Sequence, residues 1–436
     1  MHPIHPPVVE PCEVIQGLRC KECGHFYEKD SPVYVCEYDF GPLEVVYDYE
    51  KLKGKLTREV IESRPNNLWR YRELLPVESE PEVGLHSGWT PLVKADRLAA
   101  ELGVAELYIK DDSVNHPTFS YKDRVVSVAL SRAKEQGYRT VSCASTGNLG
   151  NSVSAHAARA GFDTYIFIPA GLEVGKIVGS LVYNPKVIEI DGNYDDVNRF
   201  CSEMADKYSW AFVNVNLRPY YTEGAKTYGF EIAEQLGWKL PQNIVVPVAG
   251  GTILPRVYRS FRELVELDLV EDNSPRFFAA QAAGCSPIAT AIKEESEVFR
   301  PVKPKTIAKS IAIGNPADGY EVMDIARKTG GWGEDATDEE IIDAIKILAQ
   351  CEGIFTETAG GTTLAVAKKL VEQGRIPRDE SLVVCITGNG MKTQEAVANH
   401  VGQTHLIQPT VESFERNCLP MDEAFVPEVG AVGAIV

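Results

Sequence analysis

The residues best placed to do chemistry form the run PTFSYKDR at 117–124, at the start of a predicted helix. It follows a strand-like run at 106–110 and leads into an apolar helical segment, so Lys122 lies where a loop enters a helix. Backbone N–H groups at a helix start carry partial positive charge, which favours a neutral amine over an ammonium. A neutral amine is a nucleophile that condenses with aldehydes. The alternative is an exposed lysine paired with Asp123.

Three further stretches contain small and hydroxyl residues next to predicted strands: SCASTGNLG at 142–150, PVAGGT at 247–252 and ITGNG at 386–390. Small residues let backbone N–H groups converge on a phosphate, and hydroxyls at a helix start can receive a carboxylate. For the first stretch, the alternative is an ordinary helix cap by Ser145 or Thr146, which is compatible with ligand binding.

These four stretches, in this order, resemble the pyridoxal-phosphate enzymes of the tryptophan-synthase-β type (fold type II), and most closely the threonine synthases. The similarity covers roughly residues 20–401. It includes NVNLRPYYTEGAK at 214–226, SIAIGNPADG at 310–319 and GIFTETAGGTTLA at 353–365. The resemblance implies pyridoxal 5′-phosphate as the cofactor.

The resemblance also implies roles for individual residues. Lys122, within SYKDR, is expected to hold the cofactor as a Schiff base and to move protons. Asn148 is expected to hydrogen-bond the pyridoxal 3′-oxygen, while Ser145 and Thr146 bind the substrate carboxylate. Thr387 is expected to face the pyridine nitrogen. A hydroxyl does not keep that nitrogen protonated, which favours elimination and replacement over transamination.

Two anion sites are expected from the same resemblance. The loop expected to hold the cofactor phosphate comprises Ala249, Gly250, Gly251 and Thr252. Arg218 is the candidate for the substrate phosphate, because a guanidinium binds oxyanions in a bidentate manner. Some relatives place an arginine nearer the E-G pair, where this chain has Tyr221 and Thr222. The alternative for Arg218 is a surface salt bridge.

The N-terminal region contains a C-x2-C pair, Cys20 and Cys23, followed twelve residues later by Cys36. This spacing is typical of a small zinc ribbon with two knuckles. Asp39 stands where the fourth cysteine is expected, and a three-cysteine site completed by Asp39 or by Cys12 is chemically feasible. A ribbon that no longer holds zinc is the alternative.

Strands and helices alternate from residue 88 onward, which predicts an α/β fold with parallel sheets covered by helices on both faces. The resemblance implies two doubly wound units, the smaller inserted into the larger. We expect a ribbon-like segment (1–48), a helical linker region (49–86), a large cofactor-binding domain (87–114 and 191–405), a small domain (115–190) and a tail (406–436). The expected strands are 107–110, 140–143, 164–168, 186–190, 244–247, 277–282, 353–355 and 382–387. The expected helices are 50–75, 123–136, 147–160, 175–183, 194–208, 252–267, 338–350 and 361–373.

Composition limits the partners. The 436 residues carry a formal net charge of −18, which argues against nucleic acid or an anionic membrane as a main partner. No apolar run approaches the roughly 18–20 residues that span a bilayer. The ten cysteines are scattered, and the N-terminus does not read as an export signal, so we expect a cytoplasmic protein with reduced thiols. Relatives suggest a homodimer.

The resemblance implies conversion of O-phospho-L-homoserine and water to L-threonine and phosphate by β,γ-elimination and replacement, which makes the protein a lyase of threonine biosynthesis. Sister activities are the alternatives, namely cysteate synthase acting on phosphoserine and sulfite, or threonine or serine dehydratase. A different class is an inactive, ribbon-bearing binding module.

Overall fold

The structure is a computed structural model that describes residues 7–29, 31, 33–145, 147–171, 174–192 and 194–418. The chain divides into two compact units, Met1–Ala396 and Val397–Val436. Within the described residues, the first unit contains three sheets and the second contains one helix, α15 (Val411–Cys418). Among the described residues, no helix has the length and apolar content required to cross a bilayer.

The largest sheet has six strands. They are β4 (Leu92–Lys94), β5 (Glu106–Asp111), β10 (Asn243–Pro247), β11 (Arg276–Ala282), β12 (Trp332–Ala336) and β13 (Ser381–Ile386). Their order is β12-β11-β10-β13-β5-β4, and every neighbouring pair is parallel except β4 with β5. The central strands read NIVVP and SLVVCI and are almost wholly buried. Continuous apolar runs of this kind are typical of parallel strands covered on both faces.

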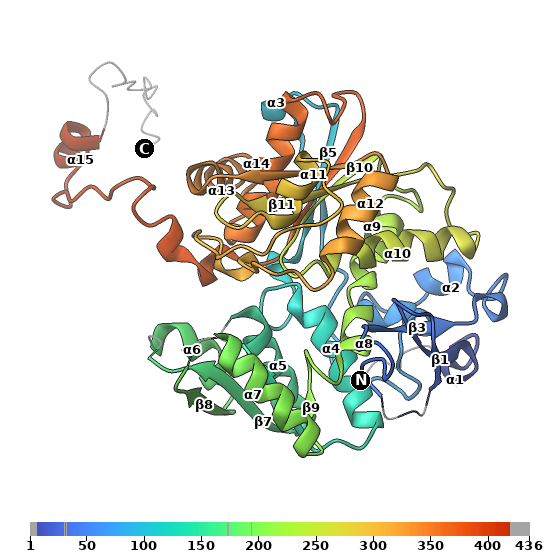
Figure 1. The fold of residues 1–436 in the computed structure, drawn as a ribbon. Helices are drawn as coiled ribbons and strands as arrows, with labels where there is room; N and C mark the ends of the chain where they lie inside the picture. The colour runs from blue at the N-terminus through green and yellow to red at the C-terminus, as the bar shows by residue number, and fades with distance from the viewer. Residues whose placement is uncertain are drawn as a thin grey trace, which may run out of the picture. The chain divides into compact units, whose positions relative to one another are not determined.

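Helices cover this sheet, as Figure 1 shows for α11 to α14. They are α3 (Asp96–Leu102), α9 (Lys226–Gln235), α10 (Ile253–Glu266), α11 (Pro287–Lys293), α12 (Gly319–Lys328), α13 (Asp338–Glu352) and α14 (Thr358–Glu372). The sequence sets some of their ends. Thr337 and Glu340 form a reciprocal capping box at the start of α13, and Gly353, with φ 71°, ends that helix.

The second sheet has four parallel strands. They are β6 (Thr140–Ala144), β7 (Asp163–Pro169), β8 (Lys186–Ile190) and β9 (Ala211–Phe212), in the order β8-β7-β6-β9. Helices α5 (Asn148–Ala160), α6 (Val174–Leu181) and α7 (Tyr194–Lys207) accompany it (Figure 1). Because β9 pairs with β6, the small sheet takes in chain beyond residue 190, where the sequence-based boundary was placed. The other domain limits stay a prediction.

The N-terminal sheet is antiparallel and has three strands. They are β1 (Ile15–Cys20), β2 (Phe26–Glu28) and β3 (Leu43–Tyr47), in the order β2-β1-β3, preceded by α1 (Pro11–Val14). A three-stranded sheet therefore lies within the segment expected to be ribbon-like, whose limits of 1–48 stay a prediction. The sheet does not stand alone, because its apolar side chains belong to the same core cluster as those of β10.

Two element predictions were wrong. A single helix over 50–75 does not form. The chain instead makes short pieces, η1 (Tyr49–Lys51), α2 (Arg58–Glu62) and η2 (Leu68–Leu74), with new helix starts capped by Thr57 and Asn67. The apolar run at 353–355 is a loop rather than a strand, and the strand that pairs with β11 at that edge of the large sheet is β12.

Candidate active site

Lys122 is the first residue of α4 (Lys122–Glu135), as the sequence predicted. The loop before it pairs with the loop that follows β13. The Tyr121 N–H donates to the Thr387 carbonyl at 2.8 Å, and the Asn389 N–H donates to the Phe119 carbonyl at 3.1 Å. Two stretches that are more than 250 residues apart in the chain are thus joined by backbone hydrogen bonds.

The Lys122 amine contacts an aromatic hydroxyl rather than a carboxylate. Its Nζ donates to the Tyr221 hydroxyl at 2.9 Å, and Tyr221 comes from α8 (Arg218–Glu223), which packs against α4. Asp123 is buried and accepts hydrogen bonds of 2.7 Å from the hydroxyls of Thr118 and Ser152. The alternative in which Lys122 pairs with Asp123 is therefore wrong.

Buried charges fix the first turn of α4. Arg124 is fully buried and donates to Asp112 at 2.7 Å, and it also pairs with Glu231 of α9. Lys110, at the end of β5, donates to the same Glu231 carboxylate at 2.7 Å. These ion pairs hold the start of α4 against the large sheet, so the backbone that presents Lys122 is rigid.

Asn148 and Thr387 converge on one buried carboxylate, that of Glu357. The Asn148 amide donates to it at 3.0 Å and the Thr387 hydroxyl at 3.4 Å, while Lys392 donates to the Asn148 side-chain oxygen at 2.9 Å. Burial raises the pKa of Glu357 and lowers the pKa of Lys392. Asn148 begins α5, which accompanies the four-stranded sheet. This contact therefore also joins the regions of the two parallel sheets.

The loop before α5 is the expected receptor for the substrate carboxylate. Ser145 is buried, and its hydroxyl accepts from the Gly147 N–H at 3.3 Å. A Cβ added at Gly147 would meet nothing within 4 Å, so open space lies beside the loop. Thr146 lies outside the described residues.

The expected phosphate loop lies between β10 and α10, with Ala249 half-buried in it. Gly251 has φ 97°, and a Cβ there would approach the Asp318 backbone to 2.9 Å, so this position requires glycine. The Thr252 hydroxyl donates to the Asp318 carboxylate at 2.9 Å, and the Asp318 N–H donates to the Gly250 carbonyl at 2.8 Å.

Arg218 lies at the same loop. Its guanidinium donates to the Asp318 carboxylate at 2.8 Å, in an ion pair that is about one-third exposed on the arginine side. Burial opposes the ionisation of Asp318, but Arg218 and neighbouring cations outweigh it and lower the pKa of the carboxyl. Arg218 thus makes a salt bridge here, next to the loop expected to bind phosphate.

The three N-terminal cysteines gather elsewhere, in the ribbon. Cys20, Cys23 and Cys36 approach one another together with Asp39, and the four ligand atoms lie within 4.8 Å of each other. Among the described residues Cys12 is not a member of this cluster.

Comparison with known proteins identifies the family. A family model described as "Pyridoxal-phosphate dependent enzyme" matches residues 83–388. The threonine synthase of Methanocaldococcus jannaschii is 40% identical over 381 residues, which are 87% of this chain and 93% of that protein. That of Methanosarcina acetivorans is 38% identical over 91% of this chain and 97% of its own. The chain belongs to the threonine synthase family of pyridoxal-phosphate-dependent enzymes.

Solved structures agree on the fold. Threonine deaminase isoform 2 of Solanum lycopersicum matches with a TM-score of 0.60 and 20% identity, covering 72% of this chain and 89% of that one. A pyridoxal 5′-phosphate-dependent aspartate racemase matches with a TM-score of 0.60 and 18% identity, covering 77% of this chain and 96% of that one. At such identities the likeness shows the fold alone, and it confirms the predicted α/β architecture.

The residues present suit the family's cofactor. Lys122 supplies an amine beside the loop of Thr387, and the glycine-bearing turn at Gly251 opens the helix α10. A Cβ added at Gly250 would meet nothing within 4 Å, so there is room for a ligand beside the loop. The first turn of a helix leaves N–H groups without intrahelical acceptors, which suits a phosphate.

Three residues of this candidate site were not predicted from the sequence: Glu357, Asp318 and Lys392. Glu357 and Asp318 lie in stretches that the resemblance had marked, but no role was assigned to them. A signal was available for Glu357, which is the single charged residue in IFTETAGGTTLA at 354–365. A charge surrounded by small and apolar residues predicts a buried, hydrogen-bonded group.

Proposed function

We propose that the protein converts O-phospho-L-homoserine and water to L-threonine and phosphate. The observation that carries the proposal is the position of Lys122, whose loop is paired with the Thr387 loop and whose amine faces α8, the helix that brings Arg218 to the phosphate loop. The two relatives named threonine synthase, similar along nearly their whole length, support this reaction over others of the same fold.

Pyridoxal phosphate, when bound, withdraws electrons from the substrate and so acidifies its C–H bonds. Lys122 is the group that we assign to bind the cofactor aldehyde and then to move protons at Cα and the neighbouring carbons. Asn148 would hydrogen-bond the 3′-oxygen of the bound cofactor, and Thr387 would lie at its ring nitrogen. Ala249, Gly250, Gly251 and Thr252 would hold the cofactor phosphate.

The substrate is held at its two anionic ends. Ser145 and Thr146, before α5, bind the carboxylate with the help of N–H groups at the helix start. Arg218 binds the substrate phosphate, and for this its guanidinium has to turn from Asp318 toward the incoming dianion. A phosphate, with more negative charge and more acceptor oxygens than a carboxylate, competes well for a guanidinium.

The site takes residues from both parallel-sheet regions, and this arrangement allows water to be excluded. Asn148 and Ser145 belong to the region of the four-stranded sheet, whereas Glu357 and Thr387 belong to that of the six-stranded sheet. The Asn148–Glu357 contact already connects the two regions. We assign the small domain (115–190, with β9) to close over the bound substrate, which strengthens electrostatic interactions in the site.

The test is phosphate release from O-phosphohomoserine with threonine identified as product. The wild type should also absorb at about 410–420 nm, where a lysine–pyridoxal adduct absorbs. Lys122→Ala should lose that band and at least about 10²–10⁴-fold in kcat. Lys368→Ala, an exposed lysine on α14, is the matched control and should keep both.

Rival activities give distinct results in the same assay. Phosphoserine and sulfite cannot yield threonine. Cysteate formed from these two substrates would therefore identify a cysteate synthase. Oxoacid release from threonine or serine would identify a dehydratase. A protein that binds no cofactor even when it is added would be the inactive binding module, and the proposal would fail.

The remaining assignments concern the cellular setting. We propose a cytoplasmic homodimer that acts on a small molecule and binds no nucleic acid, in line with the net charge of −18 and the ten unpaired cysteines. Sedimentation of the purified protein, at several concentrations, tests the dimer.

A further inference from the structure

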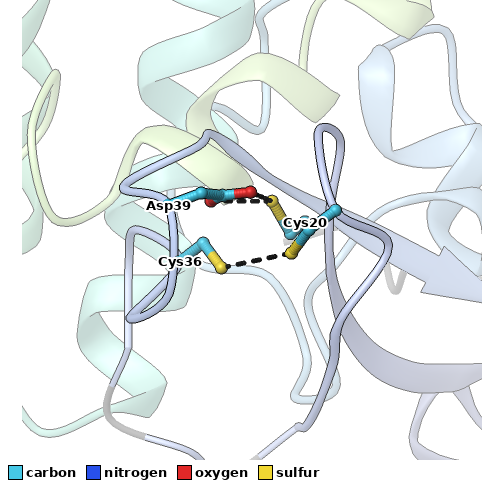
Figure 2. Close-up of side chains that lie close together, drawn as sticks. Cys20, Cys36 and Asp39 are labelled. Atoms are coloured by element: carbon cyan, nitrogen blue, oxygen red, sulfur yellow. Dashed lines mark hydrogen bonds between the residues drawn. The ribbon is translucent and has the colours of Figure 1, made fainter.

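We propose that Cys20, Cys23, Cys36 and Asp39 form a structural zinc site, a Cys3Asp site that is independent of the catalytic centre. Figure 2 shows the Cys20, Cys36 and Asp39 side chains pointing toward one another from two loops of the N-terminal ribbon. The spacing of the three cysteines had left open whether this ribbon still holds metal. The geometry of the four side chains now favours the metal.

The distances match the edges of a zinc tetrahedron. Zinc lies about 2.3 Å from a thiolate sulfur and about 2.0–2.2 Å from a carboxylate oxygen, which puts ligand atoms about 3.8 Å (S–S) and about 3.5 Å (S–O) apart. The Cys23 and Cys36 sulfurs are 3.6 Å apart. The Cys20 sulfur is 3.4 Å and 3.6 Å from the two Asp39 oxygens. A disulfide would need about 2.05 Å.

The two loops have the same backbone structure, although only one has two cysteines. In the first, the Cys20 N–H donates to the His25 carbonyl at 2.9 Å and the Gly24 N–H donates back to the Cys20 carbonyl at 3.1 Å. In the second, the bonds at equivalent positions are Cys36 N–H to Gly41 at 2.9 Å and Phe40 N–H to Cys36 at 3.0 Å. Asp39 therefore occupies the position of the missing fourth cysteine.

The second loop adopts this shape although one of its residues has an unfavourable backbone conformation. Gly24 ends the first knuckle with φ 75°, where glycine is at ease, but the equivalent residue in the second is Phe40, with φ 57°. Phe40 is 80% exposed, so packing of its ring does not explain the strained backbone. A ligand that holds Cys36 and Asp39 in place does explain it.

Close approach at Gly41 points to the same centre. A Cβ there would lie 2.9 Å from the Cys20 sulfur and 2.9 Å from an Asp39 oxygen, while the Gly41 N–H donates to Asp39 at 2.8 Å. The backbone thus passes close behind the cluster and orients the carboxylate. Three soft thiolates with one oxygen ligand select zinc over magnesium or calcium, and four protein ligands leave no open position for catalysis.

The site connects the ribbon to the rest of the chain. Lys21, inside the first knuckle, forms an ion pair with Glu321 of α12, and its N–H donates to the Pro42 carbonyl at 3.0 Å. Helix α12 begins one residue after Asp318, the carboxylate that contacts the phosphate loop. Metal binding would therefore fix the knuckle on the helix that flanks the cofactor loop.

The first experiment measures metal in the full-length protein purified under reducing conditions. We expect close to one zinc per chain. After zinc is replaced by Co²⁺, we expect the intense visible bands of tetrahedral cobalt bound to thiolates. Protein that contains no zinc and gives no cobalt–thiolate bands on titration with Co²⁺ in reductant would overturn the proposal, whatever its activity toward O-phosphohomoserine.

Variants then identify the ligands. Cys23 and Asp39 are exposed, so Cys23→Ser and Asp39→Ala should fold, which circular dichroism checks; each should weaken zinc binding at least tenfold in competition with a chelator. Asp39→Cys should retain zinc and shift the cobalt bands toward those of four thiolates. Cys12→Ser is the matched control, an exposed cysteine outside the cluster, and should bind zinc like the wild type. Equal zinc affinity in all four variants would show that the metal lies elsewhere.

Discussion

At the scale of single residues, the chemistry depends on what surrounds one amine. Lys122 donates to the Tyr221 hydroxyl, and its Nζ lies 5.6 Å and 5.7 Å from the centroids of the Tyr221 and Tyr121 rings. Some relatives were expected to place an arginine near Tyr221, and this chain has a neutral hydroxyl there instead. The hydroxyl orients the amine by accepting its hydrogen bond, without the charge that an arginine would bring.

Tyr221→Phe tests this role, because it removes one hydroxyl and keeps the ring. We expect kcat/KM for O-phosphohomoserine to fall about 5–30-fold, equivalent to about 1–2 kcal/mol, with cofactor binding retained. Tyr220→Phe is the matched control. Tyr220 is equally buried in α8, and its ring lies under Arg132 rather than next to Lys122. Equal activity of the two variants would contradict the positioning role.

Some roles of single residues could not be predicted from the sequence. Lys122 and Asn148 could be proposed as site residues because their motifs are short and continuous. Glu357 could not, because its role comes from contacts with Asn148 and Thr387, which are distant in the chain. Nothing in the local sequence says which buried carboxylate a given amide will meet.

At the scale of elements, predictions succeeded where periodicity was strong. Seven of the eight expected strands and seven of the eight expected helices lie within a few residues of observed elements. The strands β4, β9 and β12 and the helices α3, α8, α9, α11 and α12 were not predicted. Two of the failures have clear physical causes. β12 reads WGEDA and was missed because it is an edge strand with charged residues and no apolar run. The apolar run at 353–355 was wrongly predicted to be a strand. Phe355 is a loop residue whose ring packs against Gly390, where an added Cβ would come within 2.4 Å of that ring.

The turn between β10 and α10 gives a prediction at this scale. Gly251→Ala introduces a Cβ into a backbone with φ 97° and against Asp318, so the loop has to shift. We expect at least a tenfold loss of pyridoxal-phosphate affinity, measured by titrating the cofactor-free protein. Gly374→Ala has a comparable positive φ of 69° but nothing within 4 Å of the added Cβ, and it should bind cofactor normally. If both variants bind alike, the loop does not hold the phosphate.

At the scale of the whole first unit, buried ion pairs tie together elements from distant parts of the chain. Glu231 of α9 receives Arg124 from α4 and Lys110 from β5, and its carboxylate also accepts from the Trp89 N–H at 2.7 Å. All three charged side chains are fully buried. Because Arg124 follows Lys122 by two residues, the stability of this network and the position of the Lys122 amine are physically linked.

Glu231→Gln should therefore destabilise the fold as well as the site. Burial opposes the ionisation of Glu231, but Arg124 and Lys110 outweigh it and hold its pKa at about 2, below the ordinary 4.5. A depressed pKa contributes stability that is present above pH 4.5 and is lost as the pH falls toward 2. At neutral pH the variant leaves buried Lys110 without its carboxylate partner and Arg124 with Asp112 alone, so the free energy of unfolding should fall by about 3–5 kcal/mol in a denaturant titration. The difference in unfolding free energy between the variant and the wild type should narrow as the pH is lowered from 4.5 toward 2, because wild-type Glu231 then becomes neutral as well.

Glu266→Gln, at an exposed position on α10, should show no comparable loss of unfolding free energy at either pH. A pH-independent difference for Glu231→Gln would mean that lost packing, and not the buried charge, causes the effect.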